Sequence, residues 1–551
     1  MDQFCNVADF IESKVKSHLE KGNSGIWITD GSTNASSTYQ EVLNLSKNVT
    51  LNLVLMGFKK GDIVIYSATE DVHLLHIFFL GVWRAGGAVR SIYPDETEET
   101  FMEKLAESDC KWVLCNGGDV EKWNRAGKLL ASNCVTIIST GAVKTEGCLG
   151  LGSLCSGFEV KGMENEMKIA LNKNYDGDDI ALILPTSGTT GKSKGGVYTH
   201  KTLIAHFRAL ERFPMADQPD KTALVIARIT HGGGCALSLA QLVNGQRLVV
   251  LSVFNNASIL RTIEMWNPQG IFTVTNIFLK MANEPDLVKF DTSSIKYVIT
   301  TGLSTGQSFE AEMKEKFPSL KEVIMFYGMT ECAPISTSMD IWGTGPIKNY
   351  AGFENLTGSV GKAFPGVEIT IRDGQTGNIV EENGIVGEVW VKTDWMISGY
   401  FKNDVATKST IKDGVLNTGD IGYFDQTGFL CLVDRAKETF KYQSNHISPS
   451  EIEQIVASHP AVAQVCVVSV PASDGGGEVP RAFVVLRHEF AKYTVQEKDA
   501  LATKIKEMAH GKLATYKYLR GGLIILDEIP RGKAGKIDKT ALKGIHLCQQ
   551  E

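Results

Sequence analysis

Short apolar runs alternate with longer amphipathic stretches between about residues 50 and 340. The runs are rich in β-branched side chains and are bounded by turn-forming residues, as the strands of βαβ units are. This alternation predicts parallel sheets covered by helices. The expected strands are residues 63–66, 112–114, 135–138, 223–227, 248–251, 297–300 and 323–326.

The pattern changes twice in the rest of the chain. Residues 367–371 and 387–391 alternate apolar and polar positions, which is typical of antiparallel strands with one buried face. The sequence therefore predicts an α/β protein whose large N-terminal domain, residues 1–433, stacks α/β subdomains and includes a β-rich part at about 355–433. A small α+β domain, residues 434–551, is expected to follow. Its predicted elements are a helix at 449–458, strands at 464–470 and 481–486, a helix at 495–510 and a strand at 523–526.

Composition narrows the class of protein. With 551 residues the chain is too long for one hydrophobic core, and 43% hydrophobic and 22% charged residues are typical of a folded globular protein. The net charge is −7 and no long run of one sign occurs, which argues against nucleic acid as a partner. The 11 cysteines are scattered and form no Cys-x-x-Cys pair, so neither a zinc site nor a disulfide framework is expected.

The ends of the chain and its apolar runs bear on its location. The first residues lack the basic and apolar regions of a signal peptide. The longest apolar run, 74–83, is too short to cross a bilayer. The last three residues differ from the peroxisomal signal Ser-Lys-Leu. We therefore expect a cytoplasmic protein without stable membrane insertion, and the sequence leaves its oligomeric state open.

A dense cluster of glycines, hydroxyls and lysines follows Ile183 and Leu184, which close an apolar strand. Glycines let backbone N–H groups turn toward an anion, hydroxyls donate to phosphate oxygens, and lysines add positive charge. The cluster is not a Walker A loop, because Thr186 stands where that loop needs its first glycine. A phosphate-binding loop of another kind is predicted, against the alternative of a polar hairpin turn. Its candidate residues are Thr186, Ser187, Gly188, Thr189, Thr190, Gly191, Lys192 and Lys194.

This loop resembles the phosphate loop of the adenylate-forming superfamily, which includes acyl-CoA synthetases, coumarate-CoA ligases, beetle luciferases and the adenylation domains of peptide synthetases. Ser193 stands where relatives usually have proline, Met325-Phe326 where they commonly have Gln-Gly, and Ser444 where a glycine is common. The resemblance covers nearly the whole chain and implies that the C-terminal domain is mobile. The other superfamily motifs occur in order: Thr301-Gly302-Leu303, Tyr327-Gly328-Met329-Thr330-Glu331, Thr418-Gly419-Asp420, residues 434–438 and residues 530–538.

The resemblance implies a role for each motif. Thr330 would contact the α-phosphate, and Glu331 would hold Mg²⁺ together with ATP. Lys536 would be the catalytic lysine that bridges the acid and the α-phosphate. Lys441 belongs to the strand that lines the CoA channel in relatives. The nucleotide would further contact Thr301, Gly302, Leu303, Tyr327, Asp420 and Arg435. Asp420 would accept hydrogen bonds from the ribose hydroxyls, and Arg435 would reach the ribose or a phosphate.

His231 opens the segment His231-Gly232-Gly233-Gly234. It matches the superfamily position where a histidine or an aromatic residue separates the acyl pocket from the thiol channel, and a buried core histidine is the alternative. Because several implied pocket residues are apolar and the glycines leave room, a medium- or long-chain fatty acid or an aromatic acid is expected. The other implied pocket positions are His206, Gly233, Leu237, Thr300, Gly302, Met329, Pro334 and Ile335.

The predicted activity is that of an acid–thiol ligase that forms acyl-AMP and then acyl-CoA, with ATP, Mg²⁺ and CoA as cofactors. A luciferase-like monooxygenase is an alternative, because it would share every motif and oxidise its adenylate with O₂. A serine hydrolase would use Ser304 with Asp420 and His446, but it leaves the phosphate loop and Lys536 unexplained. A non-catalytic relative is disfavoured because Lys536, Glu331 and Asp420 are all present.

Overall fold

The chain divides into two compact units, which are described one at a time. The first unit comprises Met1–Leu356, Val360–Glu368 and Val391–Leu416, and the second comprises Thr357–Ser359, Ile369–Trp390 and Asn417–Glu551. The domain boundary predicted after residue 433 falls inside the second unit and stays a prediction. The computed structural model describes residues 4–23, 25–129, 135–141, 147–156, 175–186, 193–211, 213, 215, 221–302, 307–338, 359–436, 438, 440–442, 445–472, 477–532 and 537–545.

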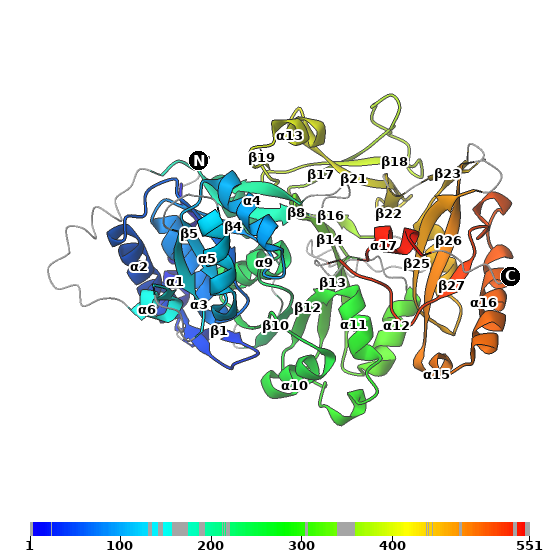
Figure 1. Ribbon diagram of the computed structural model, residues 1–551, viewed down its shortest axis with the longest axis horizontal. Helices are drawn as coiled ribbons and strands as arrows, with labels where there is room; N and C mark the ends of the chain where they lie inside the picture. Colours follow the sequence, from blue (N-terminus) through cyan, green and yellow to red (C-terminus); the bar gives the residue numbers. More distant parts are fainter. Residues whose placement is uncertain are drawn as a thin grey trace. The chain divides into compact units, whose positions relative to one another are not determined.

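A nine-stranded sheet runs through the described part of the first unit (Figure 1). Its interior pairs are parallel, as the alternating apolar runs predict, whereas strands at both edges pair antiparallel. In spatial order the strands are β16 (Lys362–Ala363), β15 (Cys332–Thr337), β14 (Glu322–Met329), β13 (Tyr297–Thr301), β12 (Gly270–Val274), β10 (Thr222–Ile226), β11 (Arg247–Leu251), β1 (Ile26–Asp30) and β2 (Ser36–Thr38).

The described part of the same unit contains a second sheet, of eight strands. In spatial order the strands are β19 (Gly399–Tyr400), β9 (Lys194–Thr199), β8 (Ile180–Thr186), β4 (Ala88–Ser91), β3 (Ile63–Ser67), β5 (Trp112–Cys115), β6 (Thr136–Ser139) and β7 (Leu149–Gly150). The strands pair in parallel except at one edge, where β9 pairs antiparallel with both of its neighbours, β8 and β19.

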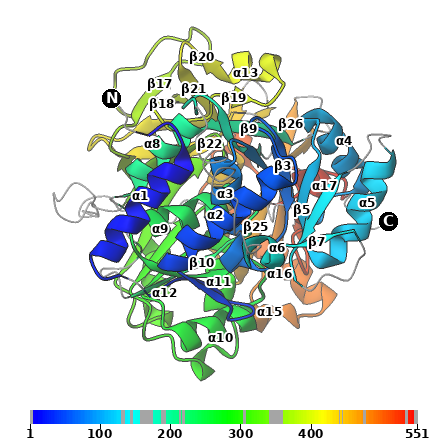
Figure 2. The same cartoon turned by 90° about the vertical axis from the view of Figure 1, so that its left-hand side faces the viewer.

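Helices separate these two sheets and cover their other faces. The helix α3 (Val72–Arg84) is apolar on nearly every side and contacts β1 of the first sheet and β4 of the second, as a fully buried helix should. Figure 2 shows it beside α1 (Val7–Glu20) and α2 (Tyr39–Leu55). Two further helices, α8 (His200–Leu210) and α9 (Gly232–Val243), pack against each other in the same layer. The outer helices are α4 (Glu98–Ser108), α5 (Val120–Leu129), α10 (Asn256–Trp266), α11 (Thr275–Ala282) and α12 (Gln307–Lys316).

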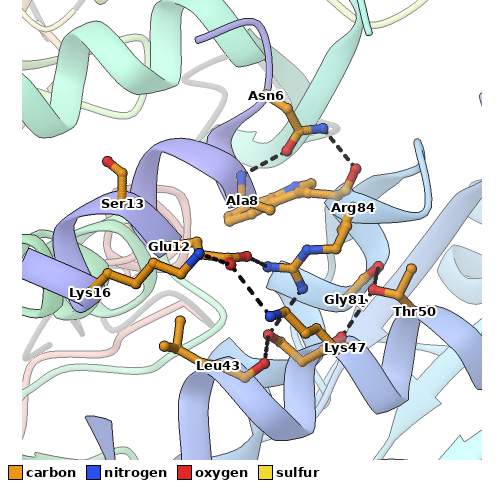
Figure 3. A network of polar contacts seen from close by, with 12 residues as sticks. Asn6, Ala8, Glu12, Ser13, Lys16, Leu43, Lys47, Thr50, Gly81 and Arg84 are labelled. Atoms are coloured by element: carbon orange, nitrogen blue, oxygen red, sulfur yellow. Dashed lines mark hydrogen bonds and ion pairs between the residues drawn. The ribbon is translucent and has the colours of Figure 1, made fainter. Parts of the chain in front are cut away.

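A partly buried ion pair links the three N-terminal helices (Figure 3). The Arg84 guanidinium, at the end of α3, lies 2.8 Å from the Glu12 carboxylate on α1, and its side chain is 4% exposed. It also donates to the Ser46 hydroxyl on α2, at 3.0 Å. Burial raises the pKa of Glu12, but Lys16, Arg84 and Lys47 outweigh it, so the pKa lies below its usual value. The carboxylate is therefore ionised and holds α1 against α2 and α3.

The second unit contains a curled β-rich part and an α+β part. The strand β18 (Gly387–Lys392) lies between β17 (Glu368–Arg372) and β21 (Val415–Phe424), and β22 (Leu430–Arg435) pairs antiparallel with β21. The α+β part packs Ile452, Val467, Phe483 and Ile505 into one core. Its elements are β23 (Phe440–Tyr442), β24 (Asn445–Ile447), α14 (Pro449–Ala457), β25 (Val462–Pro471), β26 (Glu478–Leu486), α16 (Val495–His510), β27 (Leu523–Ile525) and α17 (Lys539–Lys543).

The predicted mixed α/β fold class is confirmed, with a large N-terminal region and a smaller C-terminal one. The prediction of parallel sheets holds for their interiors only. It is wrong at the edges, because hairpins such as β8–β9 and β14–β15 reverse the chain locally. No helix within the described residues is both long and apolar enough to span a membrane.

Candidate active site

The two ends of the predicted phosphate loop pair with each other. Thr186, the last residue of β8, lies opposite Lys194, the first residue of β9, in an antiparallel hairpin. The Ser193 hydroxyl donates a hydrogen bond to the Thr186 carbonyl, at 2.9 Å. Residues 187–192 lie outside the described residues. The structure therefore sets where the loop begins and ends, and it places Lys194 on a paired strand.

Thr330 and Glu331 form the turn between β14 and β15. The sequence predicted that the motif starting at Tyr327 follows a strand. That prediction is wrong for its first three residues, because β14 continues to Met329 and pairs there with Cys332. The Tyr198 hydroxyl donates to the Thr330 carbonyl at 2.8 Å. Glu331 is 8% exposed, so its carboxylate is enclosed by protein on most sides.

Tyr400 contacts both of these hairpins and was not identified from the sequence. Its hydroxyl donates a hydrogen bond to Oε1 of Glu331, at 2.9 Å. The ammonium of Lys194 lies 4.0 Å from the centre of its ring. The phosphate-loop lysine and the predicted metal-binding carboxylate are therefore linked through one buried aromatic side chain.

Basic side chains gather in a pocket beside Lys194. Arg90 and Lys104 line this pocket together with Lys194. Arg90 and Lys104 both reach the Glu107 carboxylate, at 2.8 and 2.9 Å, so part of their charge is compensated. The pocket is also lined by Glu96, and Lys104 lies 3.5 Å from the Glu103 carboxylate, so its basic groups are largely compensated by acidic neighbours.

The predicted adenine-contacting segment begins at the carboxyl end of β13. Thr301 is half-buried and Gly302 is exposed, with a φ of +98° that favours glycine, while Leu303 lies outside the described residues. Thr300 is fully buried, and its hydroxyl lies 2.6 Å from that of Thr275. Because β13 and β14 are parallel neighbours, this segment and the Tyr327 motif share one sheet edge, where ligands of open α/β sheets bind.

His231 caps the N-terminus of α9. Its Nδ1 accepts a hydrogen bond from the backbone N–H of Gly233, at 3.1 Å. A Cβ on Gly234 would lie 2.3 Å from the Arg228 carbonyl oxygen, so this glycine permits a close backbone approach. The helix then buries Leu237, which is 5% exposed. The capping role of His231 is therefore observed, whereas its role in the wall of the acyl pocket stays a prediction.

His206, on α8, joins the predicted acyl pocket through the backbone. Its Nδ1 lies 2.7 Å from the Ala333 carbonyl oxygen, next to Pro334 and Ile335 on β15. Burial lowers the pKa of His206 to about 4. The ring is therefore neutral at pH 7, and its Nδ1 must carry the proton that Ala333 accepts. Ile335 is fully buried, and Met329 is half-buried.

Phe326 belongs to an aromatic cluster in the first unit. Its ring centre lies 5.2 Å from that of Phe213, 6.5 Å from that of Phe272 and 6.4 Å from that of Phe364. A Cβ on Gly233 would meet the Phe272 ring at 3.4 Å. Phe272 therefore adjoins the predicted acyl-pocket position Gly233, and Phe326, which stands where the superfamily usually has glycine, packs against Phe272 from within the cluster.

The remaining candidates lie in the second unit. Asp420 and Arg435 stand opposite each other on β21 and β22, and Arg435 Nε lies 3.1 Å from Asp420 Oδ1. Lys441 lies on β23, and its side chain is outside the described part. Lys536 and the hydrolase candidate Ser304 are also outside it. The backbone of His446 lies on β24.

An ion pair joins α17, which follows Lys536, to the predicted hinge at residues 434–438. Lys539 Nζ lies 2.6 Å from the Glu438 carboxylate. Burial raises the pKa of Glu453, and the charge of nearby Lys539 opposes that rise. Residues 434–438 and α17 are thereby linked within the second unit.

Within the described residues of the first unit, one carboxylate rather than a complete set of protein ligands is available to a magnesium ion. No group of three histidine, cysteine, aspartate or glutamate side chains that could hold a metal occurs among the described residues. Mg²⁺ is commonly held by one or two carboxylates together with substrate phosphates. Glu331, enclosed and oriented by Tyr400, fits such an ion arriving with a nucleotide.

Residues 21–401 match the protein family described as AMP-binding enzyme. The chain belongs to the AMP-binding enzyme family. Residues 451–536 match the C-terminal domain of AMP-binding enzymes. This confirms the predicted superfamily, whose CoA ligases use ATP, Mg²⁺ and CoA, the three cofactors expected from the sequence.

Known AMP-binding enzymes align with nearly the whole chain. A luciferin 4-monooxygenase of Photuris pensylvanica is 27% identical over 529 residues, which are 94% of this chain and 91% of the relative. A probable 4-coumarate–CoA ligase of Dictyostelium discoideum is 28% identical over 539 residues, 96% and 93% of the two chains. The ATP-bound crystal structure of MatB from Rhodopseudomonas palustris has a TM-score of 0.80 at 24% identity and covers 98% of each chain, which shows the shared fold.

Proposed function

We propose that this enzyme is an AMP-forming acyl-CoA synthetase. In the first half-reaction a carboxylate oxygen of the acid attacks the α-phosphorus of ATP, and pyrophosphate leaves. In the second, the sulfur of CoA attacks the acyl carbon, AMP leaves with the bond electrons, and the thiol proton passes to solvent. The observation that carries the proposal is that Lys194, at the end of the phosphate loop, and Glu331 both contact Tyr400.

The first half-reaction brings one anion to another, so its catalysis rests on positioning and on positive charge. Lys194 supplies charge where the phosphate loop ends, and Lys536 is proposed to act between the acid and the α-phosphate. Mg²⁺ bound to Glu331 would neutralise part of the triphosphate charge. A pair of opposite charges about 4 Å apart is worth roughly 4 kcal/mol at an effective dielectric constant of about 20. No general base is needed, because carboxylic acids are ionised near neutral pH.

The second half-reaction is assigned to the C-terminal domain by the same resemblance. In this proposal the domain turns about residues 434–437, which moves Lys536 away from the adenylate and brings Lys441 toward it. The relatives that are named CoA ligases support CoA as the acceptor. Ser444, in place of a common glycine beside that strand, is the departure that bears most on this step.

We propose a medium- or long-chain fatty acid or an aromatic acid as the substrate. The candidate pocket residues Leu237 and Ile335 are apolar and buried. The Phe272 ring adjoins Gly233 and belongs to the aromatic cluster that contains Phe326. His206 is neutral at pH 7, and its Nδ1 is bonded to Ala333. Its buried Nε2 has no hydrogen-bond partner among the described residues, so the ring offers the acid one hydrogen-bond acceptor. Burial of apolar surface favours such acids over acetate by roughly 0.8 kcal/mol for each methylene group.

The direct test is a product assay with ATP, Mg²⁺, CoA and a panel of acids. We expect acyl-CoA and AMP in equal amounts, with fatty or aromatic acids as the best substrates. ADP as the nucleotide product would contradict the proposal. Light emission or O₂ consumption in place of thioester formation would favour the luciferase-like alternative. Esterase activity that Ser304→Ala abolishes would favour the hydrolase.

A further inference from the structure

Tyr400 occupies a position that the motifs alone do not assign. Its hydroxyl bonds to Glu331 Oε1 at 2.9 Å, and Lys194 Nζ lies 4.0 Å from its ring centre. The residue is 6% exposed, so both contacts are made in an enclosed environment. One side chain thus touches a residue proposed to bind the metal and a residue proposed to bind the phosphates.

The strand pairing accounts for the contact with Lys194. In the β19–β9 pair, Tyr400 lies opposite Gly196 and Gly399 lies opposite Val197. Directly opposed residues of antiparallel strands project to the same face, and residues two apart on a strand share a face. Lys194, two residues before Gly196, therefore projects to the face that carries Tyr400. The strand pairing therefore brings the lysine at the end of the phosphate loop and this ring to the same face of the sheet.

Two backbone contacts hold Tyr400 and Glu331 in register. The Tyr400 N–H donates to the Thr407 hydroxyl at 2.8 Å, which anchors β19 to the helix α13 (Asp404–Thr410). Three residues before Tyr400, the Ile397 N–H donates to the Glu331 carbonyl oxygen at 2.9 Å. The turn that carries Glu331 is therefore bound to the Tyr400 segment through both backbone and side chain.

In the hydrogen bond between Tyr400 and Glu331, the tyrosine hydroxyl is the donor and the carboxylate is the acceptor. A tyrosine hydroxyl carries its proton at pH 7, so that of Tyr400 donates to the Glu331 carboxylate, in a hydrogen bond strengthened by the acceptor's charge. The ring face attracts the Lys194 ammonium electrostatically.

We propose that Tyr400 is a positioning residue of the adenylation step: it orients the Glu331 carboxylate for Mg²⁺ and holds Lys194 at the end of the phosphate loop. This inference rests on the proposed function in assuming that the nucleotide binds here with Mg²⁺. Tyr400 acts through Glu331 and Lys194 and need not touch substrate. Its two contacts can be separated, because Tyr400→Phe removes the hydroxyl and keeps the ring, whereas Tyr400→Leu removes both.

The test measures ATP binding by titration calorimetry on the full chain, with and without Mg²⁺ and without any acid. In the wild type, Mg²⁺ should strengthen ATP binding. In Tyr400→Phe, the factor by which Mg²⁺ strengthens ATP binding should be at least about tenfold smaller than in the wild type. The ATP affinity measured without Mg²⁺ should be unchanged. Tyr400→Leu should also lose Mg²⁺-free affinity, because Lys194 is released. Tyr39→Phe is the matched control, since it removes a buried tyrosine hydroxyl that bonds the Gln246 carbonyl elsewhere in the first unit.

A double mutant shows whether Tyr400 works through Glu331. Glu331→Gln should abolish most of the Mg²⁺-dependent gain, and adding Tyr400→Phe to it should change nothing further. An unchanged Mg²⁺-dependent gain in Tyr400→Phe, or a loss equal to that of Tyr39→Phe, would overturn the inference. An additive loss in the double mutant would also overturn it. Failure of acyl-CoA synthesis in a wild type that binds ATP with Mg²⁺ would count against the proposed function alone.

Discussion

Arg435 Nε lies 3.1 Å from Oδ1 of Asp420, across the antiparallel pair of β21 and β22. Asp420 is predicted to bind the ribose and Arg435 the ribose or a phosphate, and the structure shows the two side chains paired with each other. Asp420 is buried while Arg435 is about one-third exposed, so the carboxylate is the fixed member of the pair.

Replacing Asp420 with asparagine should weaken ATP binding by about 10- to 100-fold. A carboxylate can accept hydrogen bonds from two hydroxyls at once, whereas an amide accepts on one oxygen only, and hydrogen bonds to charged groups are worth roughly 1.5–3 kcal/mol. The measurement is the KM for ATP in the acid-dependent reaction, and the KM for the acid should not change. Asp373→Asn, in an exposed turn of the same unit, is the control. An ATP KM equal to that of the control would contradict the ribose assignment.

Loss of the Glu12 charge should destabilise the first unit. Removing one partner of this partly buried ion pair leaves Arg84 less well compensated, since among the described residues only the Asp9 charge remains near it, and we expect Glu12→Gln to lower the free energy of unfolding by roughly 1–2 kcal/mol. The Glu12 pKa is lowered, so the difference from wild type should be full above the ordinary value of 4.5 and should shrink as the pH falls below it. Urea unfolding at several pH values measures this.

The exposed pair of Arg125 and Glu98 provides the control for that prediction. Both side chains are well exposed, so Glu98→Gln should change stability far less than Glu12→Gln. Equal effects of the two substitutions would show that the Glu12 pair does not fasten the helices as described.

Acid should destabilise the enzyme through its buried histidines. Burial lowers the pKa of His206, His76 and His200 to about 4, against an ordinary value of 6.5. Between these values the unfolded chain binds protons that the folded chain does not, so stability falls as the pH falls through this window. Each histidine contributes up to about 1.4 kcal/mol per pH unit.

His206→Gln isolates one of these contributions. An amide can still donate to the Ala333 carbonyl but has no proton to gain, so urea unfolding of the variant between pH 7 and pH 5 should show a shallower loss of stability. A wild-type slope in the variant would show that His206 does not stay neutral in the folded chain.

Lys536→Ala should slow adenylation by about a thousandfold while leaving the melting temperature unchanged. A charge interaction of roughly 4 kcal/mol in the transition state corresponds to a rate effect of about this size. Lys504→Ala removes another lysine from the C-terminal part, on the exposed face of α16, and should retain full activity. Single-turnover formation of acyl-AMP gives the rate. A tenfold effect or less would show that Lys536 does not act on the reacting groups.

Much of the fold could be predicted because its signals are local. The helix expected at 495–510 coincides with α16, and the strand expected at 297–300 lies within β13. Amphipathic period and β-branched runs depend only on neighbouring residues, so the sequence reveals them directly. The motifs at the sheet edge could be placed for the same reason, since each follows or ends an apolar strand.

Other features depend on contacts between distant segments and could not be predicted. Tyr400 lies on β19, a strand of two residues whose partner β9 is some two hundred residues earlier, so no periodicity marks it. The capping role of His231 depends on where α9 begins. The end of β14 at Met329 depends on its pairing with β15. The identity of the acid depends on the shape of the acyl pocket. That shape is set by contacts between side chains that are far apart in the sequence, so the sequence pattern does not reveal it.

Exchange of labelled pyrophosphate into ATP, measured without CoA across the panel of acids, shows directly whether the enzyme forms an acyl-adenylate. We expect exchange that requires both Mg²⁺ and a fatty or aromatic acid, because the first half-reaction is reversible and needs no thiol. Exchange should fall steeply in Lys536→Ala and persist in Ser304→Ala. The absence of acid-dependent exchange across the whole panel, in an enzyme that binds ATP, would contradict the claim that this chain activates carboxylic acids as adenylates.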